Sequence, residues 1–227
     1  YEPAARAWAV AGHDAPCPLH NNCSGKHAGL VRLACDQGVD PAGHIDPRHE
    51  IQRRVTDVLE AVTGAHHGDE NRGIDGCSMP TYAIPLRALA HGFARFGTGA
   101  GLSQGRAHAV ARLRKAVAAD PFMVAGTGRY DTKIMNHFGE RTFIKMGAEG
   151  VMVASLPEEG LGIAVKTNDG ANRAAEVAMS ALLQRFGAKS VLKTDADRAV
   201  LAEASTQIMR NWQGRIVGEL RSAIEID

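Results

Sequence analysis

The chain has 227 residues, of which 44% are hydrophobic and 22% are charged, and its formal net charge is +1. This composition is ordinary for a globular protein with a sizeable core, and the near-zero charge argues against a nucleic-acid partner. No apolar run approaches the roughly 20 residues that cross a membrane, so no membrane partner is expected.

The four cysteines are too few for a disulfide framework in a chain of this length. We interpret them as reduced thiols of a cytoplasmic protein. Cys35 is expected to be a small buried side chain on a helix. Cys23 and Cys77 differ from it because each stands in a glycine-flanked polar turn, which makes them the candidate reactive or metal-binding thiols.

Hydrophobic spacing predicts mostly helices over about residues 1–140. A short helix is expected around residues 4–10, and a longer one from about Ser24 to Asp36. Asp46, followed by proline, predicts the start of the next helix, which Gly64 ends. A tight polar loop over residues 73–85 is followed by helices at about residues 86–93 and 107–117 and near residues 131–137.

Alternating apolar residues predict strands over residues 142–145, 151–156 and 161–166, and their short connections require antiparallel pairing. Helices over residues 171–186 and 195–209 and a last strand over residues 216–220 complete the chain. This order predicts an α+β fold with an antiparallel sheet covered by helices. We expect a single domain over residues 1–227, helical to about residue 140 and containing the sheet from about residue 141.

Residues 20–29 read HNNCSGKHAG and form a polar turn that opens a helix. Free N–H groups at a helix start favour an anion or a thiolate. Cys23, Lys26 and His27 lie three and four residues apart, so they share one helical face. Lys26 is either a surface lysine that binds an anion or, beside a metal, a ligand or base. His27 either orients a neighbouring ligand or is an ordinary histidine of the helix.

Residues 75–81 read DGCSMPT and set Asp75 and Cys77 in a second polar turn. Sulfur and nitrogen ligands suit zinc, but the two candidate thiols lack the C-x-x-C spacing that identifies many zinc sites. Lys145 begins a third motif, KMGAEG, at the end of a predicted strand. There it either meets a substrate carboxylate or is a surface lysine of an edge strand. Each motif alone is ambiguous.

Together with AGTGR at residues 125–129, these motifs occur in an order and at separations that resemble the L-asparaginase II family of the Rhizobium etli type, over about residues 1–220. The resemblance implies a fold similar to that of serine β-lactamases and penicillin-binding proteins. It also implies a zinc ion, whose ligands would be Cys23, Lys26 and Cys77.

The resemblance further implies substrate contacts, which would come from Ser24, His27 and Asp75. Catalytic roles would fall to Lys145 and to Lys26. The implied activity is the hydrolysis of L-asparagine to L-aspartate and ammonia, and the expected partners are this small-molecule substrate and a second copy of the chain in a homodimer.

The family's nucleophile is a serine in a Ser-x-x-Lys pair ahead of the first motif. No serine precedes Cys23, and neither Ser24 nor Ser78 is followed by a lysine three residues later. We therefore expect the sequence to be the zinc-binding C-terminal part of such an enzyme, inactive by itself. The alternative is a catalytically inactive zinc- or ligand-binding homologue. A β-lactamase-type hydrolase with another substrate is disfavoured because the Cys–Lys–Cys set is intact.

Overall fold

The computed structural model describes residues 2–12 and 15–223. The helices are α1 (Glu2–Val10), α2 (Ser24–Asp36), α3 (Glu50–Thr63), α4 (Leu86–Thr98), α5 (Gln104–Ala119), α6 (Phe122–Ala125), α7 (Tyr130–Phe138), α8 (Asn172–Phe186) and α9 (Asp195–Ala204), with single 3-10 turns at η1 (Pro18–His20), η2 (Asp69–Asn71) and η3 (Gly139–Arg141). The strands are β1 (Arg72–Ile74), β2 (Pro80–Tyr82), β3 (Phe143–Met146), β4 (Val151–Leu156), β5 (Leu161–Lys166), β6 (Thr206–Arg210) and β7 (Ile216–Arg221). Within the described residues, no helix is both long and apolar enough to cross a membrane.

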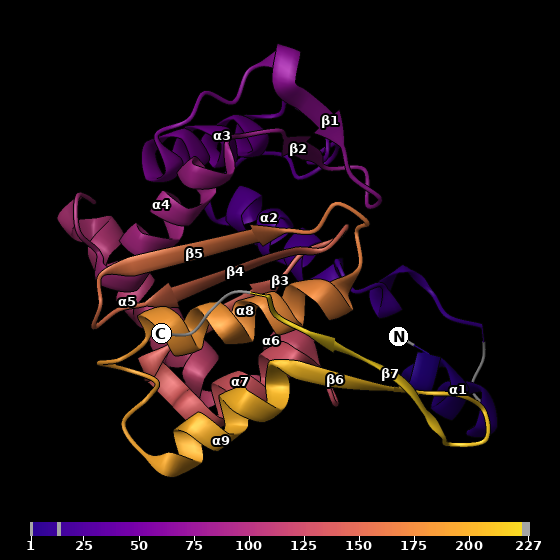
Figure 1. Ribbon diagram of the computed structural model, residues 1–227. Coiled ribbons are helices and arrows are strands. Elements are labelled where there is room, and N and C mark those ends of the chain that lie inside the picture. The colour runs from indigo at the N-terminus through magenta and orange to yellow at the C-terminus, as the bar shows by residue number, and fades with distance from the viewer. Residues whose placement is uncertain (1, 13–14, 224–227) are drawn as a thin grey trace. The chain divides into compact units, whose positions relative to one another are not determined.

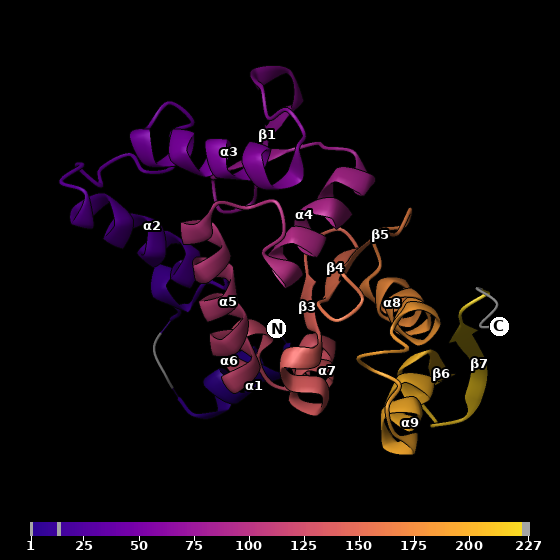
Figure 2. The same cartoon turned by 90° about the vertical axis from the view of Figure 1, so that its left-hand side faces the viewer.

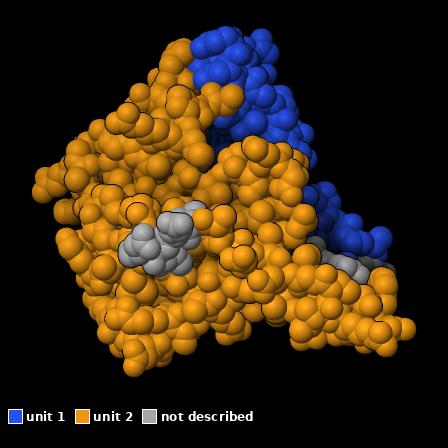
Figure 3. All heavy atoms as spheres, viewed as in Figure 1, with its two compact units in different colours: residues 1–57, 68–82 blue, residues 58–67, 83–227 orange. Residues whose placement is uncertain are grey.

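The chain forms two compact units, coloured separately in Figure 3. Unit 1 contains residues 1–57 and 68–82, and unit 2 contains residues 58–67 and 83–227. Helix α3 begins in unit 1 and ends in unit 2. Each unit is described by itself below.

A three-stranded antiparallel sheet in the order β3–β4–β5 forms the centre of unit 2 (Figure 1). Ile144 pairs with Ala154, and Leu156 pairs with Leu161, so the short connections give the antiparallel pairing that was predicted. Successive side chains point to opposite faces of a strand. Nearly all of β4 is buried, which shows that both faces of the sheet are covered. The α+β class and the three predicted strands are therefore confirmed.

Helix α4 covers one face of this sheet. Phe93 and Phe96 of α4 contact the ring of Phe143 on β3, with centroids 5.8 and 4.9 Å apart. Gly162 of β5 permits the close approach, because a Cβ at this position would overlap the backbone of α4 at Ala90. Viewed from the edge of the sheet, α4 and α5 lie on one side and α8 on the other (Figure 2).

The opposite face packs against α7 and α8, and α9 packs in turn against these two helices. The buried apolar side chains of this core are Tyr130, Ile134, Met135, Phe138, Ile144, Met146, Met152, Ala154, Leu156, Ala175, Met179, Leu183, Val191 and Leu201. Ile144, Met152, Ala154 and Leu156 have no exposed surface. Burying such side chains contributes about 1.5–3 kcal/mol each, so this layer is the main source of stability in unit 2.

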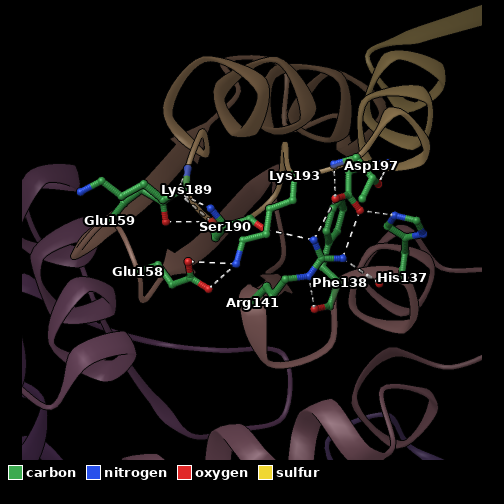
Figure 4. Close-up of polar contacts among 10 residues, drawn as sticks. His137, Phe138, Arg141, Glu158, Glu159, Lys189, Ser190, Lys193 and Asp197 are labelled. Carbon is green, nitrogen blue, oxygen red and sulfur yellow. Dashed lines mark hydrogen bonds and ion pairs between the residues drawn. The ribbon is translucent and has the colours of Figure 1, made fainter.

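Asp197 attaches α9 to α7 (Figure 4). Its side chain is 2% exposed and accepts hydrogen bonds from Arg141 at 2.9 Å and from His137 Nε2 at 2.7 Å. Thr194 caps α9 by accepting from the Asp197 N–H, and Asp197 accepts from the Thr194 N–H in return. The hydrogen bonds to Arg141 are the main reason why the pKa of Asp197 lies well below its ordinary value.

The predicted helix over residues 195–209 is wrong at its C-terminal end. The helix stops at Ala204, and residues Thr206–Arg210 form β6, which pairs with β7 from Thr206 opposite Arg221. Local spacing favoured a helix, but β7, which follows after a short turn, supplies the backbone hydrogen bonds of a strand. The last strand therefore belongs to a separate two-stranded sheet.

In unit 1 the predicted helix from Ser24 to Asp36 has the expected bounds. The next helix begins at Glu50 rather than beside Asp46, because Asp46 closes a local turn by accepting from the Arg48 N–H at 2.8 Å. The tight loop over residues 73–85 contains two short paired strands, β1 and β2, that the sequence analysis missed. Cys35 is exposed, so the expectation of a buried side chain is wrong.

Candidate active site and metal centre

The first turn of α2 positions two of the predicted zinc ligands. Cys23 is the residue before the helix, and its N–H donates to Asn21 Oδ1 at 2.8 Å. The Cys23 carbonyl accepts the His27 N–H at 3.1 Å, which fixes one helical turn at this point. Lys26 follows Cys23 by three residues and therefore lies on the same face of the turn.

The connection between β1 and β2 positions the third predicted ligand. Asp75 Oδ1 accepts the N–H groups of Cys77 and Met79 at 2.9 and 3.0 Å, and the Asp75 N–H donates to the Met79 carbonyl at 2.9 Å. Ser78 takes a left-handed φ of 72° to close this turn. The Asp75 side chain thus acts as the centre around which the Cys77 loop folds.

These two turns meet through side chains. Lys26 Nζ donates to Asp75 Oδ2 at 2.9 Å. Cys23 lies three residues before Lys26, and Cys77 lies two residues after Asp75, so this ion pair joins the turns that carry the two thiols. The Lys26–Asp75 ion pair therefore joins the two turns within unit 1, although 49 residues separate Lys26 from Asp75.

The charges of this cluster support one another. Burial alone would lower the pKa of Lys26, but hydrogen bonds to Cys77 and Asp75 outweigh it and raise the pKa. Burial likewise opposes ionisation of Asp75, yet hydrogen bonds from Cys77, Lys26 and backbone N–H groups hold its pKa well below the ordinary value. Burial, with Asp75 nearby, raises the pKa of Cys77. Lys26 is therefore a cation, Asp75 an anion and Cys77 a neutral thiol in this arrangement.

The donor set fits zinc by its chemistry. Two sulfur donors and one nitrogen donor leave the fourth position of a tetrahedral site to water or substrate, as in catalytic zinc sites. Across residues 2–12 and 15–223, no group of three or more His, Cys, Asp and Glu side chains could hold a metal ion. The candidate centre therefore depends on Lys26 as its third donor, and a metal there would have to displace protons from Lys26 and Cys77.

The other predicted substrate residues of unit 1 lie beside this cluster. Ser24 is the first residue of α2, half-buried, with its N–H bonded to the Asn21 carbonyl. His27 Nδ1 lies 2.9 Å from Nε2 of His44, and both rings are half-buried. The sequence analysis did not single out His44, and its position between two helices gave no signal of this contact.

Lys145 belongs to unit 2, at the penultimate position of β3. Its side chain is 44% exposed, and its Nζ donates to the Met146 carbonyl and lies 3.9 Å from Oδ2 of Asp131. Asp131 is a buried residue of α7 that the sequence analysis did not consider. The exposure of the Lys145 amine leaves it accessible to a small molecule.

A Ser-x-x-Lys spacing does occur in the chain, at Ser190 and Lys193, which the sequence analysis overlooked (Figure 4). Ser190 is fully buried, and its hydroxyl lies 2.9 and 2.8 Å from the two oxygens of Glu159. Lys193 Nζ lies 2.8 Å from Glu158. Because each member is paired with its own carboxylate, these residues attach the β4–β5 turn to the segment before α9 and do not form a nucleophile with its base.

The fold and this cluster define an α+β protein with a candidate thiol–amine metal centre. The chain belongs to the L-asparaginase II family, whose sequence model matches residues 1–222. No curated protein matches the sequence. Membership in this family indicates asparaginase-type amidohydrolase function with a small-molecule substrate, asparagine.

Proposed function

We propose that this protein is a zinc-dependent L-asparaginase that hydrolyses the side-chain carboxamide of L-asparagine to L-aspartate and ammonia. Family membership supports the reaction class. One structural observation supports the specific site: Lys26, from the motif that contains Cys23, forms an ion pair with Asp75, from the motif that contains Cys77.

In this proposal Cys23, Lys26 and Cys77 hold the zinc ion, and Asp75 orients both the Lys26 amine and the Cys77 loop. Zinc, when bound, supplies a Lewis acid that can orient or polarise an amide carbonyl. Residues that hydrogen-bond to metal ligands, as Asp75 does to Lys26, fix the orientation of those ligands and tune their basicity. As a zinc ligand, Lys26 would be a neutral amine, and its remaining N–H groups could still donate to the carboxylate of Asp75.

The remaining residues take the roles that fit their chemistry. Lys145 contributes charge or proton transfer, because its amine is partly exposed at the end of β3. His27 and Ser24 contact the polar ends of the substrate from the start of α2. Asparagine carries an α-carboxylate, an α-ammonium group and a carboxamide, so a mixture of cationic and neutral polar groups suits it.

Three further proposals rest on the sequence resemblance. The protein is of the Rhizobium etli type, its fold is similar to that of serine β-lactamases and penicillin-binding proteins, and it acts as a homodimer in the cytoplasm. The covered antiparallel sheet of unit 2 is compatible with this fold.

Ammonia release from L-asparagine by the full-length natural protein tests the function, with L-aspartate identified by mass spectrometry. Lys145→Met should lower kcat/KM by about 10²–10⁴-fold, the range of acid–base groups. Lys166→Met is the matched control. Lys166 is the last residue of β5 and, like Lys145, donates to the carbonyl of the next residue.

Absence of ammonia release from zinc-loaded wild-type protein would favour an inactive homologue instead. Hydrolysis of other amides, with asparagine untouched, would favour a β-lactamase-type hydrolase. Full activity of Lys145→Met would remove Lys145 from the proposed site while leaving the reaction class in place.

A further inference from the structure

Both backbone polar groups of Met146 are bonded to side chains. Its N–H donates to Oδ2 of Asp131 at 2.8 Å, and its carbonyl accepts from Nζ of Lys145. The same Asp131 oxygen lies 3.9 Å from Lys145 Nζ. Asp131, Met146 and Lys145 therefore form a closed ring of polar contacts at the end of β3.

Asp131 completes the edge of the sheet. Among the described strands, β3 pairs with β4 on one side only, and the Met146 N–H points away from that pairing toward α7. Asp131 lies in the first turn of α7, where the positive end of the helix favours a carboxylate. An asparagine or serine could accept the same single hydrogen bond, so edge capping alone does not require a charge.

The charge of Asp131 is weakly compensated by hydrogen bonds. The residue is fully buried, and within the described part of the chain its Oδ1 has no hydrogen-bond partner. A buried carboxylate with one accepted N–H bond is costly unless a cation shares its charge. Lys145 supplies such a cation at 3.9 Å.

Other charged groups also face this position. Glu176 of α8 is half-buried, and burial raises its pKa, with Asp131 adding to the rise. The charges of Arg129 and Lys133 oppose that rise in the pKa of Glu176. Within the described residues, Lys145 is the cation that forms an ion pair with Asp131, at 3.9 Å.

We propose that Asp131 is the positioning residue of Lys145: its buried carboxylate holds the Lys145 ammonium group at the end of β3 while its hydrogen bond to Met146 fixes the strand end. The catalytic meaning of this contact rests on the proposed function, but the contact itself does not. Asp131 acts through Lys145 and does not touch the substrate, because it has no exposed surface.

Competitive acetylation of the amines tests the contact without any enzyme assay. Acetic anhydride acetylates a lysine amine faster when the amine is not held in an ion pair. Mass spectrometry of the peptides gives the acetylation rate at each lysine. In Asp131→Asn, Lys145 should react about fivefold faster, which corresponds to the ~1 kcal/mol between unit charges about 4 Å apart in bulk water. Lys166 is the internal control, since it donates to the Thr167 carbonyl. An unchanged ratio of Lys145 to Lys166 rates would overturn the proposal.

A reciprocal variant keeps the test decisive if Asp131→Asn does not fold. Lys145→Met leaves the buried carboxylate without this cation, so the thermal midpoint should fall by at least about 2 °C, whereas Lys166→Met should leave it unchanged. Equal midpoints for the two variants would contradict the proposal.

If the protein also releases ammonia from asparagine, Asp131→Asn should lower kcat more than it raises KM, because a misplaced amine affects the reacting step first. Glutamate at position 131 should not restore kcat, since its extra methylene would shift the carboxylate away from the positions that Met146 and Lys145 require. Altered acetylation without asparaginase activity would uphold the contact and reject the function. A fall in kcat/KM of Asp131→Asn that comes entirely from a higher KM, with kcat unchanged, would reject the positioning role.

Discussion

Replacing Asp197 by alanine tests the most heavily bonded buried carboxylate of unit 2. The side chain is 2% exposed and bonds to Arg141, His137 and the N–H of Thr194. Removing one partner of a buried ion pair costs about 3–5 kcal/mol, and losing a helix cap costs about 1 kcal/mol more. Because Arg141 and His137 are each 28% exposed, water recovers part of this loss.

We therefore expect Asp197→Ala to lower the free energy of unfolding by about 3 kcal/mol. For a chain of this size the thermal midpoint should fall by about 6–12 °C. Urea unfolding followed by circular dichroism and scanning calorimetry measure the two quantities. The loss should appear in the transition that reports the core of α7, α8 and the sheet, because Asp197 joins α9 to that core.

Asp195→Ala is the matched control for this variant. Asp195 also lies in the first turn of α9, but its side chain is fully exposed and 4.0 Å from its ion-pair partner, Arg198. Exposed pairs of this kind contribute little. The reasoning would be refuted if Asp197→Ala stayed within about 1 kcal/mol of wild type, or if the two alanine variants lost equal stability.

Three further predictions concern pH, packing and metal. Because the pKa of Asp197 is held below its ordinary value, its stabilising contribution is present above about pH 4 and lost as the pH falls through the folded value. The stability difference between wild type and Asp197→Asn should therefore shrink from pH 5 toward pH 2 in urea titrations, and a widening gap would contradict the sign. Gly162→Ala should cost about 2–3 kcal/mol in urea unfolding because its Cβ overlaps the backbone of α4, whereas Gly105→Ala, which meets nothing within 4 Å, should be nearly neutral. Cys77→Ser should reduce bound zinc from about one equivalent per chain toward zero by elemental analysis, with the exposed Cys35→Ser as the control, and equal zinc in both would reject the ligand set.

The sequence predicted those elements whose signal is local. The bounds of the helix from Ser24 to Asp36 and the strands over residues 151–156 and 161–166 follow from apolar periodicity and from turn residues close by. The two polar motifs, through their resemblance to a known family, also identified Cys23, Lys26, Asp75 and Cys77 as candidate site residues. Periodicity and turn chemistry need no distant partner, so they can be read directly from neighbouring residues.

Tertiary structure decided what depends on partners outside the local segment. Residues Thr206–Arg210 are a strand because β7 supplies their hydrogen bonds, and the Lys26–Asp75 ion pair joins the loop around Cys77 to the start of α2. The contact of Asp131 with Lys145 and the pairing of Ser190 with Glu159 likewise join separate elements. A carboxylate can serve as a cap, an ion-pair partner or a buried charge, and only the groups that the fold places around it determine which of these it becomes.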